Sequence, residues 1–381
     1  MSVLLCILVS IITCLADHGN TDCRDGILLV GGKTTSGPSQ QITLLSSKEG
    51  WCERSGFPDL PIPLIKPGAY LVRGYLLVCG FPGEFPCMYT QRGWSGWSPM
   101  YSLANQTDYK MTYSARVGSV MMVSKDTDVE GPDPRGETYR IQHNPVHHNP
   151  GGITQWMQIS GSPFSLGRGF HDADLSGYNG DLYLSGGFGL AEGAFGSTAG
   201  SVVSVARWSV SGTELESGPP AFEDGVVPNM GNQWDGGHRQ SAITGREGHA
   251  SAVFSENLVV GGGFCHHMES CGGGASCCQC NSCRTLSATE YYDGVEWRNM
   301  ADMVHARAHF GLQPMCGMLV ALGGITVQST GDGVACPEDQ LLSSLEVTWS
   351  LEGEWVEEDW LELPEARGYF TALAVNEMEC M

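Results

Sequence analysis

The sequence predicts an all-β protein, and three observations carry this prediction. Of the 381 residues, 41% are apolar and only 16% are charged, and the chain contains 52 glycines and 19 prolines. This composition is typical of many short strands joined by turns rather than of a helical bundle. Short apolar runs end on glycines, as in DLYLSGGF (181–188) and NLVVGGGF (257–264). Few windows show a helical period longer than a turn or two.

The N-terminal segment has the form of a secretory signal peptide. The first residues, MSVLLCILVSIITCLA, are apolar and uncharged, and the polar DHGNTDCRD follows at once. We expect a signal peptide over residues 1–16, with cleavage after Ala16. A membrane anchor is the alternative, but the run is shorter than the roughly 20 residues that a bilayer requires. The mature chain, residues 17–381, is therefore expected to be secreted and extracellular, without membrane insertion.

Charge and cysteine content narrow the expected partners. The formal net charge is −22, which disfavours nucleic acid and anionic membrane surfaces and favours basic proteins or cations. Of 15 cysteines, Cys6 and Cys14 lie in the expected leader, which leaves 15 − 2 = 13. In an oxidising compartment most of these should form disulfide bonds. The odd number leaves one thiol over, or one bond to a second chain in a disulfide-linked dimer.

Three markers recur along the chain in one order, which predicts an internal repeat. The first is an apolar strand ending in glycine: ILLVGG (27–32), YLLVCGF (75–81), DLYLSGG (181–187), NLVVGGG (257–263) and LVALGG (319–324), with VMMVSKD (120–126) as a sixth strand without glycines. The second is a basic residue ahead of each unit: Lys66, Arg116, Arg168, Arg246, Arg307 and Arg367. The third is an isolated tryptophan near the end of a unit: Trp51, Trp97, Trp156, Trp297 and Trp355.

The repeat resembles the kelch repeat, whose units are four-stranded antiparallel blades of a β-propeller. The family signature is a glycine pair after a strand, a later Tyr, and a Trp about six residues further on. The matching positions are Gly31, Gly32, Gly186, Gly187, Gly261, Gly262, Tyr292, Trp297, Gly323, Gly324 and Trp355. Trp349 replaces the Tyr of the last unit, and residues 66–165 match only loosely. The resemblance implies that these residues, with the repeat arginines, are architectural.

The expected fold is a six-bladed kelch-type β-propeller closed by pairing of the C-terminal strand with the N-terminal strand, which leaves no loose sheet edge. The blades are expected at 26–65 plus 367–376, 66–110, 111–165, 166–240, 245–303 and 305–364. Cys23 and Cys380 flank the closing strand pair, so we predict a disulfide bond between them as a clasp. The lone histidines His171, His249 and His309, near the first strands of their blades, are expected to pack or hydrogen-bond inside the ring.

The loop FCHHMESCGGGASCCQCNSC (264–283) interrupts the fifth blade with six cysteines and two histidines. Cys277, Cys280 and Cys283, with His266 and His267, have spacings that suit zinc or copper. Behind a signal peptide, three local disulfide bonds are the favoured interpretation, and fifteen pairings are open to six cysteines. A transition metal stays the alternative.

The loop DTDVEGPDPRGE (126–137) approaches the spacing of a calcium-binding loop. Asp126, Asp128, Glu130 and Glu137 would supply the oxygens, although Glu130 replaces the usual Asp or Asn and prolines stand where helices usually flank such a loop. An acidic, solvated turn is the favoured interpretation, and calcium is the alternative. Asn105 begins the acceptor sequence Asn-Gln-Thr, which predicts N-glycosylation of a secreted chain.

These observations favour an extracellular scaffold that binds another protein through loops on one face, with a basic partner preferred. Two alternatives stay open. One is a secreted, metal-dependent enzyme similar to the copper radical oxidases, although the sequence has no Tyr-His dipeptide of the kind that family uses. The other is a disulfide-linked structural protein of the matrix. We expect no catalytic residue from any motif in the chain.

Overall fold

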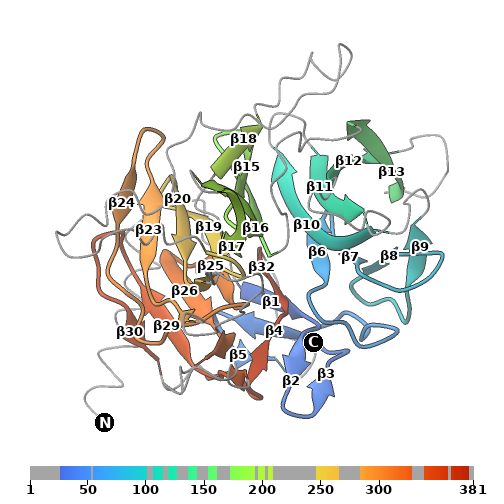
Figure 1. The fold of residues 1–381 in the computed structure, drawn as a ribbon. Helices are drawn as coiled ribbons and strands as arrows, with labels where there is room; N and C mark the ends of the chain where they lie inside the picture. The colour runs from blue at the N-terminus through green and yellow to red at the C-terminus, as the bar shows by residue number, and fades with distance from the viewer. Residues whose placement is uncertain are drawn as a thin grey trace, which may run out of the picture.

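The computed structural model describes residues 26–52, 55–100, 106–114, 119–126, 136–143, 153–160, 172–193, 196–201, 205–208, 246–265, 284–327, 339–358 and 362–376. Over these ranges the chain is all-β, and no helix occurs in them. Every strand pair is antiparallel. Figure 1 shows the sheets arranged around a middle towards which strands such as β6, β10, β19, β25 and β32 lie.

The first three large sheets have four strands each. The first has the order β32 (Thr371–Val375), β1 (Gly26–Val30), β4 (Ile42–Ser46), β5 (Gly50–Trp51). The second contains β6 (Gly68–Val72), β7 (Tyr75–Cys79), β8 (Cys87–Gln91) and β9 (Ser98–Met100). The third contains β10 (Gln106–Ser114), β11 (Ser119–Asp126), β12 (Gly136–His143) and β13 (Ile153–Ser160).

Three further large sheets come from the second half of the chain. In the described residues the fourth sheet has three strands, β14 (Asp174–Tyr178), β15 (Asp181–Ser185) and β18 (Val205–Trp208). The fifth has β19 (Ala250–Phe254), β20 (Asn257–Gly261), β23 (Thr289–Tyr292) and β24 (Trp297–Asn299). The sixth has β25 (Gly311–Met315), β26 (Met318–Leu322), β29 (Leu345–Thr348) and β30 (Val356–Glu357).

Small ribbons decorate these sheets. They are β3 (Gly37–Pro38), β2 (Lys33–Thr34) and β31 (Arg367–Gly368) in one sheet, and the pairs β16 (Phe188–Gly193) with β17 (Gly196–Ser201), β21 (Phe264–Cys265) with β22 (Arg284–Thr285), and β27 (Ile325–Thr326) with β28 (Gln340–Leu341). The ribbons continue the chain beyond the glycine corners that end the second strands.

The terminal strands β32 and β1 pair with each other. Their register runs from Gly26 opposite Val375 to Val30 opposite Thr371. β1 therefore lies between a strand from the C-terminal end and β4, so neither of its edges is open. The predicted pairing of the C-terminal strand with the N-terminal strand is present.

The apolar cores lie between neighbouring sheets, which explains why the second strands read as continuous apolar runs. In β1, Leu28 and Val30 face a cluster shared with the second sheet, whereas Ile27 and Leu29 face a cluster shared with the sixth. All four side chains are fully buried. A strand covered on both faces loses the alternation of a half-exposed strand. The whole run of apolar residues is then needed, as the sequence shows.

The repeat tryptophans pack at the same sheet-to-sheet contacts. Trp297 joins the cluster between the fourth and fifth sheets. Trp355 joins the cluster between the fifth and sixth, and its indole N–H donates to Thr289 Oγ1 at 3.3 Å. Each indole thus ties the outer part of its own sheet to the preceding sheet, which is a packing role.

The glycine pairs make corners with positive φ. Gly31, Gly186 and Gly323 have φ of 62°, 58° and 57°, and the glycines that follow them have φ near 100°. In the fifth sheet this pattern falls on Gly262 and Gly263, at 62° and 99°, while Gly261 is the last residue of β20. The sequence alignment, which took Gly261 and Gly262 as the pair, was therefore one residue early.

Each corner is held by the backbone of the following repeat. The second glycine of a pair donates its N–H to the carbonyl of Leu64, Arg246, Arg307 or Arg367. Leu64, and not Lys66, thus occupies in the second sheet the position that arginine occupies in the later ones. The predicted alignment of Lys66 with the arginines was wrong by two residues. Lys66 lies instead two residues before β6.

The third sheet also departs from the predicted division. β10 runs from Gln106 to Ser114, so the expected boundary between residues 110 and 111 falls inside a strand. Arg116 follows β10 rather than preceding it. Since this unit has no glycine pair, the sequence offered no marker from which to fix its start.

Candidate functional site

A ring of left-handed residues surrounds one end of the space between the first strands. Lys66, Asp172, Gly248, His309 and Tyr369 each lie two residues before the first strand of their sheet, with φ between 48° and 61°. Their backbones form a chain of hydrogen bonds: Lys66 N–H donates to Tyr369 O (2.8 Å), Tyr369 to His309 (2.9 Å), His309 to Gly248 (2.6 Å), and Gly248 to Asp172 (2.8 Å). These bonds offset the roughly 1 kcal/mol that a left-handed L-residue costs.

Side chains from this ring converge across the mouth. The Lys66 ammonium donates to Asp172 Oδ1 at 2.6 Å, although the two residues belong to the second and fourth sheets and the third lies between them. His309 Nδ1 lies 4.0 Å from the same oxygen. The His309 and Tyr369 rings stack with centroids 4.3 Å apart, and Tyr369 donates its hydroxyl proton to Asp339 Oδ2 at 2.6 Å.

Glu247, next to the ring residue Gly248, is a carboxyl group whose pKa is raised at this mouth. Burial raises its pKa to about 7, the charge of Asp172 adds to the rise, and Lys66 opposes it. Two carboxyl groups, an imidazole and an ammonium therefore meet at one place. This combination is suited to proton transfer, because a carboxyl with a pKa near the ambient pH can act both as acid and as base.

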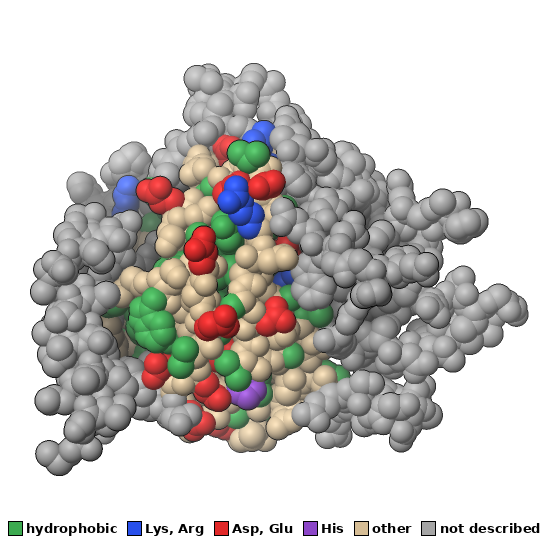
Figure 2. All heavy atoms as spheres, turned by 90° about the vertical axis from the view of Figure 1, so that its left-hand side faces the viewer, with side chains coloured by type: hydrophobic (Ala, Val, Ile, Leu, Met, Phe, Trp, Pro, Cys, Tyr) green, Lys and Arg blue, Asp and Glu red, His purple; other side chains and the backbone are tan. Residues whose placement is uncertain are grey.

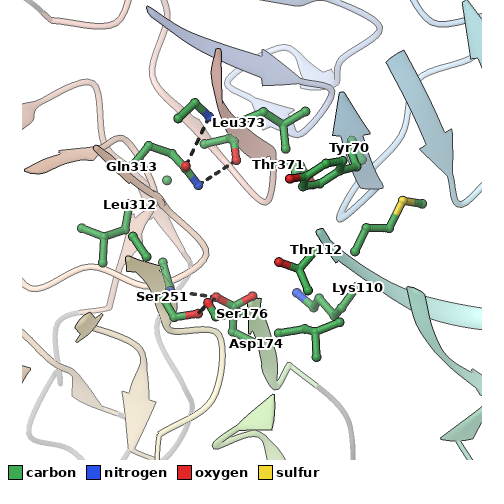
Figure 3. Close-up of a pocket in the computed structure, with 18 of the residues that line it drawn as sticks. Tyr70, Lys110, Thr112, Asp174, Ser176, Ser251, Leu312, Gln313, Thr371 and Leu373 are labelled. Carbon is green, nitrogen blue, oxygen red and sulfur yellow. Dashed lines mark hydrogen bonds between the residues drawn. The ribbon is translucent and has the colours of Figure 1, made fainter. Parts of the chain in front are cut away.

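Below the mouth, a cavity of about 1170 Å³ lies inside the first strands of the sheets. Several polar side chains in its wall link neighbouring sheets (Figure 3). Gln313 donates to Ala372 O (3.0 Å) and accepts from Ala374 N–H (3.2 Å), and Thr112 Oγ1 accepts from Gly177 N–H at 3.0 Å. These groups replace the hydrogen bonds that first strands of adjacent sheets do not make with each other.

A second polar constellation lies in the middle of the cavity wall. Asp174 Oδ2 accepts from Ser251 N–H at 2.7 Å and from Ser251 Oγ at 2.5 Å, and Ser176 Oγ lies 2.6 Å from Ser251 Oγ. Burial raises the pKa of Asp174, while the charge of Lys110 and the bonds from Ser251 lower it. In Figure 3 the Lys110 and Asp174 side chains point toward one another.

His249 lines the same cavity, and its side chain is buried in the wall. Its Nε2 is 2.8 Å from Ser185 Oγ, and burial, together with the charge of Arg246, holds its pKa well below the usual value. His249 is therefore neutral and hydrogen-bonded, as was expected of the lone histidines. His171 lies outside the described residues. His309 differs, because its imidazole reaches the mouth, where Nδ1 lies 4.0 Å from Asp172 Oδ1.

Most sequence-predicted sites lie outside the part of the chain that the structure describes. This applies to Cys23, Cys380, Asn105, Asp128, Glu130, His266, His267, Cys277, Cys280 and Cys283. Asp126 ends β11 and Glu137 lies in β12, but their side chains are not described. The clasp, the glycan, the calcium loop and the cysteine-rich loop stay predictions. Within the described ranges, no group of three or more His, Cys, Asp or Glu side chains could hold a metal ion.

Most cysteines were expected to form disulfide bonds, but the pairing of Cys79 with Cys87 was not predicted. Cys79, at the end of β7, bonds to Cys87, its register partner at the start of β8. Cys52 and Cys316 are disulfide-bonded as well. The spacing of Cys79 and Cys87 across the glycine- and proline-rich FPGEFP was the available signal, because a hairpin brings its two ends together.

The sequence also gave no sign of Lys110, Asp172, Asp174 or Tyr369. None belongs to a motif, and each becomes notable only when strands from different sheets are brought together. One signal was available for Asp172 and Tyr369. The position two residues before the first strand of a sheet carries a polar side chain in several repeats, and the residue type differs from repeat to repeat. Once the first strands are located, that position can be read directly from the sequence.

Comparisons with known proteins bear on the fold alone. No family model and no curated protein matches the chain. Among solved structures, the chain is similar to that of YjhT, with a TM-score of 0.55 and 11% sequence identity, over 82% of this chain and 88% of that one. In the described residues, no helix is long and apolar enough to cross a bilayer.

Proposed function

We propose that the chain is a secreted six-bladed kelch-type β-propeller that binds an extracellular protein through surface turns on one side. The large sheets supply the blades, and contacts between first strands run from β6 through β10, β14, β19, β25 and β32 back to β6. The pairing of β32 with β1 supports closure of the ring between the chain ends. The disulfide between Cys79 and Cys87 is compatible with an oxidising compartment.

The observation that carries the binding proposal is an exposed tryptophan among carboxylates. Trp349 begins the turn between β29 and β30, and it is 53% exposed. The same turn contains Glu352 and Glu354, and Glu357 follows in β30, all exposed. Tryptophan is enriched in the centres of protein interfaces, where its large ring is covered by the partner.

A matching turn in the neighbouring sheet extends this surface. Between β23 and β24, Val295 is 77% exposed and Glu296 is exposed beside it. The nearby Arg298 already pairs with Asp293 at 3.0 Å and with Glu296 at 3.2 Å. Figure 2 shows this side of the molecule with many carboxylates and few basic side chains. A partner with a basic surface would be attracted and oriented by this charge.

The test is capture of partners from the native extracellular fluid by the purified full chain. A variant combining Trp349→Ala, Glu352→Gln, Glu354→Gln and Glu357→Gln should lose the captured partner, and capture by the unchanged chain should weaken as salt is added. The matched control neutralises exposed carboxylates of the first two sheets, Glu49→Gln, Asp59→Asn and Glu84→Gln, and should capture normally. Equal capture by the two variants would rule out this surface. A chain lacking residues 264–283 tests the cysteine-rich loop in the same assay.

A second candidate, an enzyme, is favoured by one observation. His309, Asp172, Glu247 and Lys66 meet at the mouth of the cavity, where an imidazole and carboxyl groups can exchange protons with a bound molecule. These groups would support acid–base chemistry by the chain itself. Stoichiometric copper in purified protein would instead favour the oxidase alternative. A dimer on non-reducing gels that reductant dissociates would favour the structural alternative.

A further inference from the structure

One charged side chain in the cavity wall has a role that the fold does not account for, whereas Asp174 already bonds to Ser251 of the adjacent sheet. Gln313, Thr112 and Thr371 each bond to backbone of an adjacent sheet, so their polar groups serve the architecture. Lys110 is different, because its ammonium projects from β10 into the cavity toward Asp174 on β14 (Figure 3). Such a charge inside a cavity is costly in free energy unless it interacts with an opposite charge, water or a ligand.

The directions of the hydrogen bonds around Asp174 determine which oxygen atoms can still accept a hydrogen bond from a ligand. Ser251 uses both its N–H and its hydroxyl proton on Asp174 Oδ2. The Ser251 oxygen therefore accepts the Ser176 proton across 2.6 Å, which leaves lone pairs on Ser176 Oγ as acceptors. The wall here presents acceptors on Asp174 and Ser176, and a donor on Lys110 opposite them.

Electrostatics decides which kind of molecule fits between these groups. The charges of Asp174 and Lys110 are opposite and face each other, so an added cation near Asp174 would be repelled by Lys110, and an added anion by Asp174. A neutral group that both donates and accepts meets neither penalty. Hydroxyl groups do this, and two adjacent hydroxyls can donate to Asp174 and Ser176 while accepting from Lys110.

Apolar surface completes the wall. Tyr70 from β6 lines the same cavity, and the neighbouring Leu312 and Leu373 have side chains that are almost fully buried in the clusters between sheets (Figure 3). The aromatic ring of Tyr70 can cover the C–H face of a small ring or chain whose hydroxyls point toward the polar groups. We infer that this cavity binds a small neutral polyhydroxylated molecule, with adjacent hydroxyls bridging Asp174 and Lys110.

The experiment is calorimetric or saturation-transfer titration of the full chain. The neutral probes are D-glucose and xylitol, and the charged probes are D-glucosamine, a cation at low to neutral pH, and D-gluconate, an anion. We expect saturable binding of at least one neutral probe in the millimolar range, and weaker binding of both charged probes. Absence of saturable binding by both neutral probes, or tighter binding of either charged probe, would overturn the inference.

Variants locate the binding. Lys110→Met should weaken neutral-probe binding by about tenfold or more, as expected for the loss of a charged hydrogen bond. Lys48→Met, on the outer surface, is the matched control and should bind as the unchanged chain does. Ser176→Ala should weaken binding by a few-fold while the strands stay paired. Unchanged affinity in Lys110→Met, with an unchanged circular dichroism spectrum, would refute the site.

This site is separate from the outer surface around Trp349. The variant that removes Trp349 and its neighbouring carboxylates should therefore bind the neutral probes normally. Loss of protein capture and loss of polyol binding are then independent results, and either proposal can fail without the other.

Discussion

The buried arginine of the sixth sheet gives the sharpest test of the architecture. The Arg307 and Glu346 side chains are both 0% exposed, and one guanidinium nitrogen of Arg307 donates to Glu346 Oε1. The other donates to Gly323 O at 2.7 Å and to Ser344 O at 3.2 Å. Burial lowers the pKa of Arg307, and Glu346 opposes that effect. The guanidinium therefore connects the first-strand approach, the glycine corner and the third strand of one sheet.

We predict that Arg307→Met lowers the free energy of unfolding by about 3–5 kcal/mol, because it leaves the Glu346 carboxylate buried without its cation. Glu346 would keep only the backbone N–H groups of Val304, at 2.5 Å, and His305, at 2.9 Å. Arg307→Lys should cost less, since it keeps the charge but loses the planar fork that reaches several acceptors. The double variant Arg307→Met with Glu346→Gln should recover part of the loss, because no buried charge then stays unpaired.

Urea unfolding followed by tryptophan fluorescence measures these differences. Arg298→Met is the control, because the Arg298 side chain is 51% exposed and its ion pairs lie at the surface. Exposed pairs contribute about 0–1 kcal/mol, so this control should hardly move the transition. If Arg307→Met destabilised the protein no more than Arg298→Met, the assignment of the repeat arginines to the architecture would be wrong.

Two other predictions concern the corner glycines and the mouth. Gly324→Ala should lower the free energy of unfolding by about 2–4 kcal/mol, because φ is +98° and an added Cβ would lie 2.8 Å or less from atoms of the neighbouring segment. Gly317→Ala is the control, because Gly317 has φ of +78° but open space around it, and it should lower the free energy of unfolding by about 1 kcal/mol in the same assay. Glu247, facing Asp172 and Lys66, has a folded pKa of about 7 against a usual 4.5, so the folded state binds the extra proton and stability falls as pH rises through that window. Glu247→Gln should flatten this slope between pH 5 and 8; an identical slope in both proteins would contradict the assignment.

The repeat markers predicted those features that depend on one sheet and its neighbour. A corner of two glycines, a buried tryptophan and a pair of terminal strands are set by local turn geometry and by apolar coverage on both faces, and each leaves a pattern in the sequence. The third sheet was divided wrongly because its unit lacks the glycine pair. Lys66 was assigned to the arginine position because the spacing of the repeats is not exact. The residue whose carbonyl accepts the N–H of a corner glycine is Leu64, and spacing alone does not distinguish it from Lys66 two residues later.

Lys110 and Asp174 in the cavity wall could not be predicted from the sequence, for a different reason. Lys110 and Asp174 lie 64 residues apart on strands of different sheets, as their numbers show, and neither has a neighbour in the sequence that would suggest a pair. Their juxtaposition depends on how far each sheet turns relative to the next, which no local pattern encodes. The cysteine-rich loop (264–283) and the loop with calcium-type spacing (126–137) lie mostly outside the described residues, so their metal and calcium hypotheses stay predictions.

In the ring at the mouth, one backbone conformation carries different residue types, and this bears on function. At five equivalent positions the backbone has the same left-handed conformation, yet the residues are Lys, Asp, Gly, His and Tyr. Four of the five carry a Cβ where glycine would be less strained. The conformation therefore does not select the residue type, and the side chains must be explained by what they contact. Lys66 and Asp172 meet across the mouth, and His309 and Tyr369 stack beside them. Strained backbone that carries convergent polar groups is the pattern expected of a working site, so the mouth is the first place to look for chemistry if a polyol is shown to bind in the cavity and to be a substrate.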